Sequence, residues 1–294
     1  MENILEIEGL CKEYDGFALK DVSFALPKGY IMGFVGQNGS GKTTTIRSIL
    51  GMANPDSGRI TVCGLDNRKD AIAMKERIGV VFDSLYLAGH LNAKQIEQQL
   101  KPFYKDWDSK EYASRIAQFE LPDNRPVGDF SKGMKMKLMI AAALSHKAEL
   151  IILDEPTSGL DPVARDELLD ILAEYIEDEN RGVLFSTHIT SDVERIADYI
   201  TVLHAGRVWF TGTKDELESS YVVVKGAADE FPDALLEKCI GYHAYRNGSD
   251  AMLHTKYLDE VPEELVTEKA SIDEILVYIA KEAKYAGHHE NDQI

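Results

Sequence analysis

A glycine-rich stretch at residues 36–43 has the composition of a loop that wraps around phosphate groups. It reads Gly36, Gln37, Asn38, Gly39, Ser40, Gly41, Lys42 and Thr43, and Thr44 follows directly. The glycines let backbone N–H groups surround phosphate oxygens, Lys42 can reach the β- and γ-phosphates, and the Thr43 hydroxyl can bind Mg²⁺. Chance matches to G-x-x-x-x-G-K-[ST] occur in on the order of one chain in a hundred. An apolar run precedes the loop and a helical pattern follows it, which favours a nucleoside triphosphate site over a turn without a ligand.

Two later apolar runs end in side chains that suit the same chemistry. LIILDE, residues 150–155, places Asp154 where it can hold Mg²⁺ beside the phosphates, and Glu155 where it can act as general base on a water. GVLFSTH, residues 182–188, ends in His188, which can hydrogen-bond the γ-phosphate and the attacking water. By itself, an Asp-Glu pair after a strand is as common in a solvated loop, and a single histidine is more often structural. Their position beside Lys42 favours a catalytic group made of Glu155, His188 and Lys42.

The stretch FSKGMKMKLMIAAALS, residues 130–145, begins a helix with an unusual charge distribution. Lys132, Lys135 and Lys137 lie in its first turns, although the N-terminus of a helix already favours anions through its dipole. Ser131 can cap the helix and Gly133 lets another group approach its first N–H groups closely. An anion near this end explains the pattern; the alternative, that the lysines face solvent, applies best to Lys137.

The elements that must position these residues alternate between strand and helix. Apolar or alternating runs at 3–8, 17–26, 30–35, 59–63, 78–82, 149–155 and 182–188 predict strands, with a turn at Asp15-Gly16. Helical patterns occupy 92–120, with a break at Pro102, and 163–179. This rhythm predicts an α/β fold with a mostly parallel sheet whose strand ends hold the ligand.

Composition limits the classes of function. The 294 residues are 44% hydrophobic and carry a net charge of −18, which disfavours binding to nucleic acid or to anionic lipid. Three cysteines without a C-x-x-C pair indicate a reducing compartment. The N-terminus does not resemble a signal peptide, and no apolar run approaches the ~18 residues that span a bilayer, so we expect membrane contact only through a partner.

The end of the chain differs from the rest. Residues 213–294 carry 8 Lys+Arg and 18 Asp+Glu, which is a net charge of −10. We interpret 221–294 as a small acidic domain of two or three strands and helices, ending in an amphipathic helix near 271–283. Its role is either packing against the first domain, or dimer contact and regulation.

The motifs together, in this order, closely resemble those of an ATP-binding cassette (ABC) ATPase. The resemblance covers about residues 3–220 and rests on the loop 36–43, SKGMK at 131–135, LIILDEPTSGLDP at 150–162 and STH at 186–188. It implies a P-loop fold with a mostly parallel central sheet, an antiparallel β subdomain, a helical insertion at about 84–148 and a small α+β C-terminal domain. The domains would then be 1–220 and 221–294, with ATP and Mg²⁺ as cofactors.

The resemblance also assigns roles to single residues. Ser131 and Gly133 match the family's Leu-Ser-Gly-Gly-Gln helix, which caps the γ-phosphate held by the opposite subunit, whereas Phe130, Lys132 and Met134 depart from it. Tyr14 would stack on adenine, and Asp161 would reach across the dimer seam. Asp83 stands where the family usually has a glutamine that touches Mg²⁺, and its extra negative charge leads us to expect slower hydrolysis.

The function implied is that of the energy subunit of a transporter. ATP-dependent pairing with a second nucleotide-binding subunit, identical or different, would drive a separate transmembrane permease from the cytoplasmic face of the membrane. Asp83 and residues 103–108 are similar to the bacterial exporters of drugs and peptide antibiotics. The permease would dock near 83–112, where candidate anchors are Leu85, Tyr86, Leu87 and Trp107. The alternative is a soluble ABC-type ATPase that acts as a mechanical switch in translation or DNA repair, which the single cassette and the charge disfavour.

Overall fold

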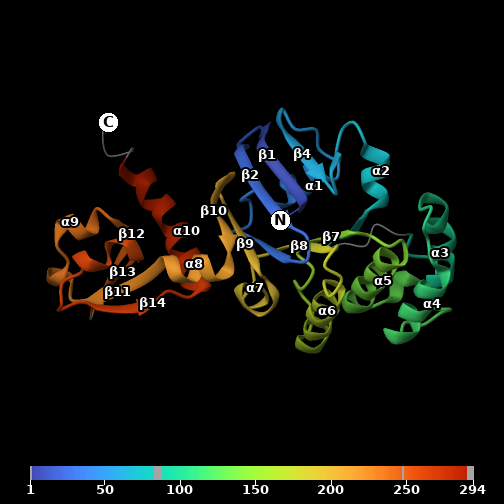
Figure 1. The fold of residues 1–294 in the computed structure, drawn as a ribbon. Helices are drawn as coiled ribbons and strands as arrows, with labels where there is room; N and C mark the ends of the chain where they lie inside the picture. Colours follow the sequence, from blue (N-terminus) through green and yellow to red (C-terminus); the bar gives the residue numbers. More distant parts are fainter. Residues whose placement is uncertain (1, 83–87, 247, 290–294) are drawn as a thin grey trace. The chain divides into compact units, whose positions relative to one another are not determined.

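The chain divides into two compact units, Met1–Thr211 and Gly212–Ile294. Figure 1 shows the computed structural model, which describes residues 2–82, 88–246 and 248–289, with side chains to residue 281. We expected the boundary after residue 220. It falls earlier because the helix α8 (Lys214–Ser220) contacts the strand β11 (Tyr221–Gly226) and is part of the second unit.

A six-stranded sheet forms the centre of the first unit. Its order is β10-β9-β3-β8-β7-β6, and the neighbours from β9 to β6 pair in parallel. The strands are β3 (Ile31–Val35), β6 (Ile78–Val81), β7 (Leu150–Asp154), β8 (Gly182–Thr187), β9 (Tyr199–His204) and β10 (Arg207–Thr213). Every residue of β3, β7 and β8 is buried, as expected for parallel strands that are covered on both faces. This confirms the predicted parallel sheet.

An antiparallel sheet of order β2-β1-β4-β5 packs on the central sheet. Its strands are β1 (Asn3–Tyr14), β2 (Phe17–Pro27), β4 (Ser57–Val62) and β5 (Leu65–Asp66). The predicted turn at Asp15-Gly16 joins β1 to β2, with Tyr14 opposite Phe17. One hydrophobic core contains buried residues of both sheets, and the rings of Phe24 and Phe34 lie 5.2 Å apart within it.

The helices of the first unit follow the strand ends or form a separate group. Those next to the strands are α1 (Lys42–Ile49), α2 (Ala71–Glu76), α6 (Pro162–Tyr175) and α7 (Thr190–Ile196). The group is α3 (Ala93–Leu100), the 3-10 turn η1 (Lys101–Phe103), α4 (Ser109–Gln118), η2 (Val127–Asp129) and α5 (Lys132–Ser145), gathered on one side of the unit in Figure 1. Side chains cap α3, α4 and α5 at Asn92, Asp108 and Ser131, and Pro102 lies in the break between α3 and α4.

The second unit is a four-stranded antiparallel sheet with helices, of order β12-β13-β11-β14. Its further elements are β12 (Cys239–Tyr245), β13 (Gly248–His254), β14 (Val266–Lys269), η3 (Ala228–Glu230), α9 (Asp233–Leu236), η4 (Thr255–Glu260) and α10 (Ile272–His289). The prediction of two or three strands was too low. β14 was missed because all four of its residues are exposed, so it lacks the alternation of a half-buried strand. No helix in the described parts of the chain is long and apolar enough to cross a bilayer.

Candidate functional site

The loop between β3 and α1 is built so tightly that two of its positions require glycine. Gly41 caps α1 with φ +112°, a backbone conformation that other residues rarely adopt. A Cβ atom on Gly41 would lie 2.5 Å from Leu19 Cδ2, and one on Gly36 would lie 2.3 Å from the carbonyl oxygen of Leu203. The loop therefore approaches its neighbours through its backbone, and within it Ser40 N donates to the carbonyl oxygen of Gln37 at 3.1 Å.

A pocket of about 240 Å³ opens above this loop at the N-terminus of α1. Its lining is Phe17, Gln37, Asn38, Gly39, Gly41, Lys42, Thr43, Thr44 and Glu155. The volume is smaller than the roughly 300–1,000 Å³ of a pocket that encloses a whole drug-sized ligand, so it suits the phosphates and not the base. Ser40 Oγ is buried and has no hydrogen-bond partner among the described residues. An unsatisfied buried hydroxyl beside a helix N-terminus and a lysine fits a bound polyphosphate.

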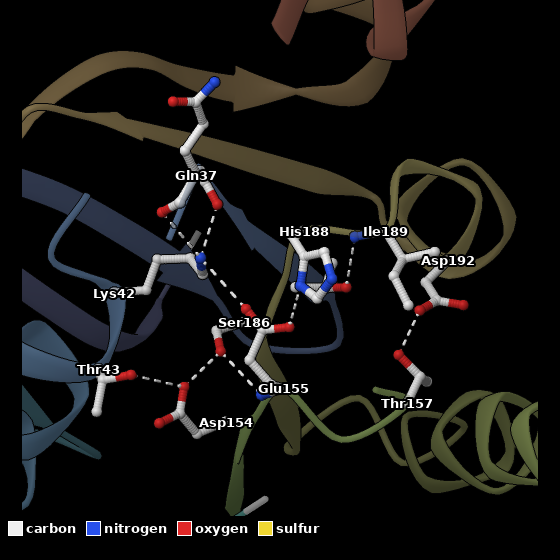
Figure 2. A network of polar contacts seen from close by, with 12 residues as sticks. Gln37, Lys42, Thr43, Asp154, Glu155, Thr157, Ser186, His188, Ile189 and Asp192 are labelled. Carbon is white, nitrogen blue, oxygen red and sulfur yellow. Dashed lines mark hydrogen bonds and ion pairs between the residues drawn. The ribbon is translucent and has the colours of Figure 1, made fainter. Parts of the chain in front are cut away.

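Lys42 lines this pocket, and its ammonium group takes part in the polar contacts drawn in Figure 2. Its side chain is only 5% exposed, and Nζ donates to the carbonyl oxygens of Gly36 at 2.6 Å and Gln37 at 3.4 Å. Nζ also lies 3.2 Å from Glu155 Oε1. A buried cation held by neutral carbonyl groups and one carboxylate is well placed to bind phosphate oxygens.

Two of the residues predicted to bind Mg²⁺, Thr43 in α1 and Asp154 at the end of β7, lie next to each other. Thr43 Oγ1 donates to Asp154 Oδ1 at 3.3 Å, and Ser186 Oγ donates to the same oxygen at 2.6 Å (Figure 2). A hydroxyl and a carboxylate are hard oxygen ligands, and Mg²⁺ is usually held by one or two such groups together with substrate phosphates and water. Thr43 and Asp154 therefore fit a magnesium ion, with Ser186 orienting the carboxylate.

Glu155 lies between Lys42 and His188. Its backbone has φ +50°, and its N–H donates to the oxygens of Ser186, which is paired with Asp154 across the two strands. Oε2 lies 2.7 Å from His188 Nδ1, whereas Oε1 is buried and accepts no hydrogen bond, because its contact with Lys42 lacks hydrogen-bond geometry. An oxygen with open lone pairs beside a phosphate pocket can accept a proton from a water molecule.

The remaining predicted binding residues do not line the phosphate pocket of their own chain. Ser131 Oγ accepts from Met134 N at 3.2 Å as the cap of α5, and a Cβ on Gly133 would lie 3.2 Å from the Cβ of Ala164 in α6. Asp161 accepts hydrogen bonds from the N–H groups of two residues in the first turn of α6. Ser131, Gly133 and Asp161 thus lie at the N-termini of α5 and α6, and none of them lines the pocket that contains Lys42.

Lys135 and Lys137, near Ser131, contact neighbouring groups of the chain. Lys135 Nζ donates to the carbonyl oxygen of Gly128 at 3.0 Å, and Lys137 Nζ lies 2.6 Å from Glu167 Oε2. The reading that Lys137 merely faces solvent was therefore wrong, because it forms an ion pair with α6. Lys132 lies close to the loop before α6. If Gly159 in that loop carried a Cβ atom, this atom would lie 3.6 Å from Lys132 Nζ.

Phe17 is a pocket residue that sequence reasoning missed. We expected Tyr14 to stack on the adenine, and its ring is 46% exposed with Lys12 Nζ 5.4 Å from its centroid. Phe17, its partner across the hairpin, lines the phosphate pocket. The predicted hairpin turn places Tyr14 and Phe17 opposite each other, so the sequence already indicated that Phe17 lies close to Tyr14. Asp83, with Leu85, Tyr86 and Leu87, lies outside the described residues.

Comparisons with known proteins agree with this geometry. Residues 19–158 match the family described as ABC transporter. The chain is 37% identical over 210 residues to "ABC transporter ATP-binding protein NatA" of Bacillus subtilis (strain 168), covering 69% of this chain and 85% of NatA. The chain belongs to the ABC transporter ATP-binding proteins. This ABC ATP-binding protein is also 30% identical over 260 residues to "Bacitracin transport ATP-binding protein BcrA" of Bacillus licheniformis, covering 86% and 85%.

A solved structure shows that the likeness extends to the fold. "Structure of ATP binding subunit of ABC transporter" is 31% identical, with a TM-score of 0.67 and coverage of 73% of this chain and 92% of the other. The P-loop ATPase fold, the antiparallel sheet and the helical group predicted for this ABC ATP-binding protein are thereby confirmed. The alternative of a switch in translation or DNA repair finds no support in these relatives.

Proposed function

We propose that this ABC ATP-binding protein hydrolyses ATP at Glu155 to power a separate transmembrane permease. The observation that carries the proposal is the convergence of Lys42, Asp154, Glu155 and His188 at the carboxyl ends of β3, β7 and β8. These strands are neighbours in the sheet, so their ends meet at one edge. A triphosphate at this edge would face a cation, a Mg²⁺-binding carboxylate and a proton acceptor at once.

Each residue has a distinct part in this proposal. Lys42 and the loop N–H groups bind the phosphates. Thr43 and Asp154 would hold Mg²⁺, which would supply positive charge beside the phosphate oxygens. Glu155 Oε1 takes the proton of the attacking water, and His188 holds the carboxylate in place through Oε2. Asp83, in the position of the usual glutamine, adds negative charge and slows this step.

Ser131, Gly133 and Asp161 are proposed to complete the site of a second subunit. A helix N-terminus with nearby lysines attracts an anion, and the chain's own phosphate pocket is lined by none of the three. Two subunits joined head to tail would place this helix against the partner's triphosphate. ATP then favours the closed pair over the open subunits only because it binds the closed pair more tightly. This difference in binding free energy must amount to several kcal/mol to change the populations.

We expect the Glu155→Gln variant to change from monomer to dimer in light scattering when ATP and Mg²⁺ are added, because bound ATP is no longer consumed. Adding Ser131→Ala should abolish the dimer, since the hydroxyl at the shared site is lost. Asp108→Ala is the matched control: it removes the cap of α4, away from the site, and should leave dimerisation intact. A chain that binds ATP and stays monomeric would contradict a site shared by two copies.

The cargo is proposed to be a drug, a peptide antibiotic or a similar small solute, and the direction export. Support comes from the relative named for bacitracin transport, which matches over 86% of this chain. The protein would then work at the cytoplasmic face of the membrane, held there by the permease.

A mostly apolar groove offers a docking site for that permease. It measures about 390 Å³ and is lined by Met52, Val80, Phe82, Leu100, Tyr104, Met139, Ala142, Ala143 and His146. The rings of Tyr104 and His146 stack at 4.0 Å, and His146 Nδ1 is buried without a hydrogen-bond partner among the described residues. Trp107 is not in the lining; its Nε1 donates to Glu97 and its ring packs near Tyr112.

A charge in this groove should therefore weaken the complex with the permease. We expect Leu100→Glu to reduce co-purification of the permease in detergent by about tenfold or more, because a carboxylate would be desolvated in an apolar contact. ATP binding by the same variant should be unchanged. Leu258→Glu, at a 42% exposed position of the second unit, is the control and should co-purify normally.

A further inference from the structure

A buried carboxylate behind the catalytic residues connects three segments of the site. Asp192 in α7 has no exposed surface, and both of its carboxylate oxygens accept hydrogen bonds. Thr157 Oγ1 donates to Oδ2 at 2.6 Å, a contact drawn in Figure 2, and Arg165 Nε donates to Oδ1. Arg165 Nη2 also donates to Ser191 Oγ at 2.6 Å. The sequence patterns gave no role to Asp192, Thr157 or Arg165.

The first of these segments carries the proposed general base. Thr157 is two residues after Glu155, in a turn where Ser158 N donates to the carbonyl oxygen of Glu155 at 3.3 Å. Glu155 has a positive φ without being glycine, and such a conformation persists only where the surroundings hold it. Thr157 is 2% exposed and does not line the phosphate pocket, so its bond to Asp192 holds this turn from inside the protein.

The other two segments carry further site residues. Asp192 follows His188 by four residues, and its own N–H donates to the carbonyl oxygen of Ile189 at 3.2 Å. Arg165 lies in the first turns of α6, where its N–H donates to the carbonyl oxygen of Asp161 at 3.0 Å. One carboxylate thus joins the turn after β7, the start of α6 and the start of α7.

The negative charge of the Asp192 carboxylate is balanced by the adjacent guanidinium group of Arg165. A buried carboxylate is stable only when it is paired and hydrogen-bonded, and Arg165 with Thr157 supplies both conditions. Since the pair is neutral as a whole, its influence on the phosphate pocket is geometric more than electrostatic.

We propose that Asp192 is a positioning residue for hydrolysis, which holds the Glu155 carboxylate against His188 through Thr157. The inference rests on the proposed function, in which Glu155 is the general base. A misplacement of reacting groups by about 1 Å can cost on the order of a hundredfold in rate, while substrate binding by a separate loop is unaffected.

The test is the pair Thr157→Val and Thr157→Ser in the purified full chain. Valine keeps the size and removes the hydroxyl, whereas serine keeps the hydroxyl. We expect Thr157→Val to lower kcat for ATP by on the order of ten- to a hundredfold with KM unchanged, and Thr157→Ser to restore kcat. If Thr157→Val does not fold, Arg165→Gln takes its place, because it removes the other donor at a partly exposed position.

A second readout needs no turnover. The ¹⁵N signals of the His188 ring, identified with His188→Ala, report its contact with Glu155 in the chain without nucleotide. In Thr157→Val they should move toward their positions in Glu155→Gln, and in Thr157→Ser they should stay at those of the wild type. A variant that only lowers stability would leave them unchanged below its melting temperature.

Three results would overturn the inference. The first is an unchanged kcat in Thr157→Val. The second is a fall in kcat accompanied by a rise in KM, and the third is a set of unchanged His188 signals in that variant. A fourth result separates this inference from its basis: wild-type turnover in Glu155→Gln would refute the proposed function and the inference with it. A Glu155-dependent enzyme with a fully active Thr157→Val would refute the inference alone.

Discussion

Glu155→Gln is expected to lower ATP turnover by on the order of a thousandfold, while ATP still binds. The amide has nearly the size of the carboxylate, so the phosphate loop and the Mg²⁺-binding pair Thr43 and Asp154 keep their places. What is lost is the basic Oε1, which is buried, accepts no hydrogen bond and faces the phosphate pocket. The measurement is phosphate release under saturating ATP and Mg²⁺, together with nucleotide affinity by calorimetry.

The matched control is Glu149→Gln, directly before the opposite end of β7. Glu149 forms an ion pair with Arg77 at a half-exposed position, and the same change of charge there should leave turnover within about twofold. If both variants lose activity equally, the loss comes from the fold and not from catalysis. If Glu155→Gln remains fully active, Glu155 is not the base.

Gly206→Ala is expected to destabilise the first unit by about 2–5 kcal/mol, the sum of backbone strain and overpacking. Gly206 has φ +76°, and a Cβ there would lie 1.9 Å from the carbonyl oxygen of Ala18. Its N–H donates to the carbonyl oxygen of Ser40, and its own carbonyl oxygen accepts from Lys20 N. The clash would therefore also shift the phosphate loop and weaken ATP binding.

Gly64→Ala separates these two effects. Gly64 has nearly the same φ, +75°, but a Cβ there meets no atom within 4 Å, so only the strain of about 1–2 kcal/mol remains. Urea unfolding can be followed by tryptophan fluorescence, because both tryptophans, Trp107 and Trp209, belong to the first unit. Equal destabilisation in the two variants would mean that the contact with Ala18 relaxes without cost.

The parts of the site that were predictable are those that the sequence holds in one continuous stretch. The loop 36–43 and the strand end at Asp154 and Glu155 combine their residue types with the apolar runs that place them. Ser186 and Asp192 were missed because their roles depend on which strand or helix lies next to them, whereas Phe17 was overlooked although the predicted hairpin pairs it with Tyr14. Phe17 enters the pocket through the β1–β2 hairpin, and Ser186 reaches Asp154 because β8 pairs with β7.

The same distinction holds for the fold. Buried strands such as β3 and β7 were predictable because β3 contains only apolar residues and a glycine, and β7 has four apolar residues before Asp154. β14 reads Val-Thr-Glu-Lys and is a strand only because β11 supplies its hydrogen bonds, which no local pattern reveals. The boundary was expected after residue 220, although the acidic composition already begins near residue 213, where α8 starts and packs against β11.

The ion pair between Lys42 and Glu155 also bears on substrate binding. Its ammonium group already has two carbonyl oxygens and the carboxylate of Glu155 as partners. An incoming phosphate must displace one of them, and the carboxylate is the one that the phosphate's own negative charge repels. Substrate affinity and the release of the base are therefore thermodynamically linked: the measured ATP affinity includes the free energy of breaking this ion pair.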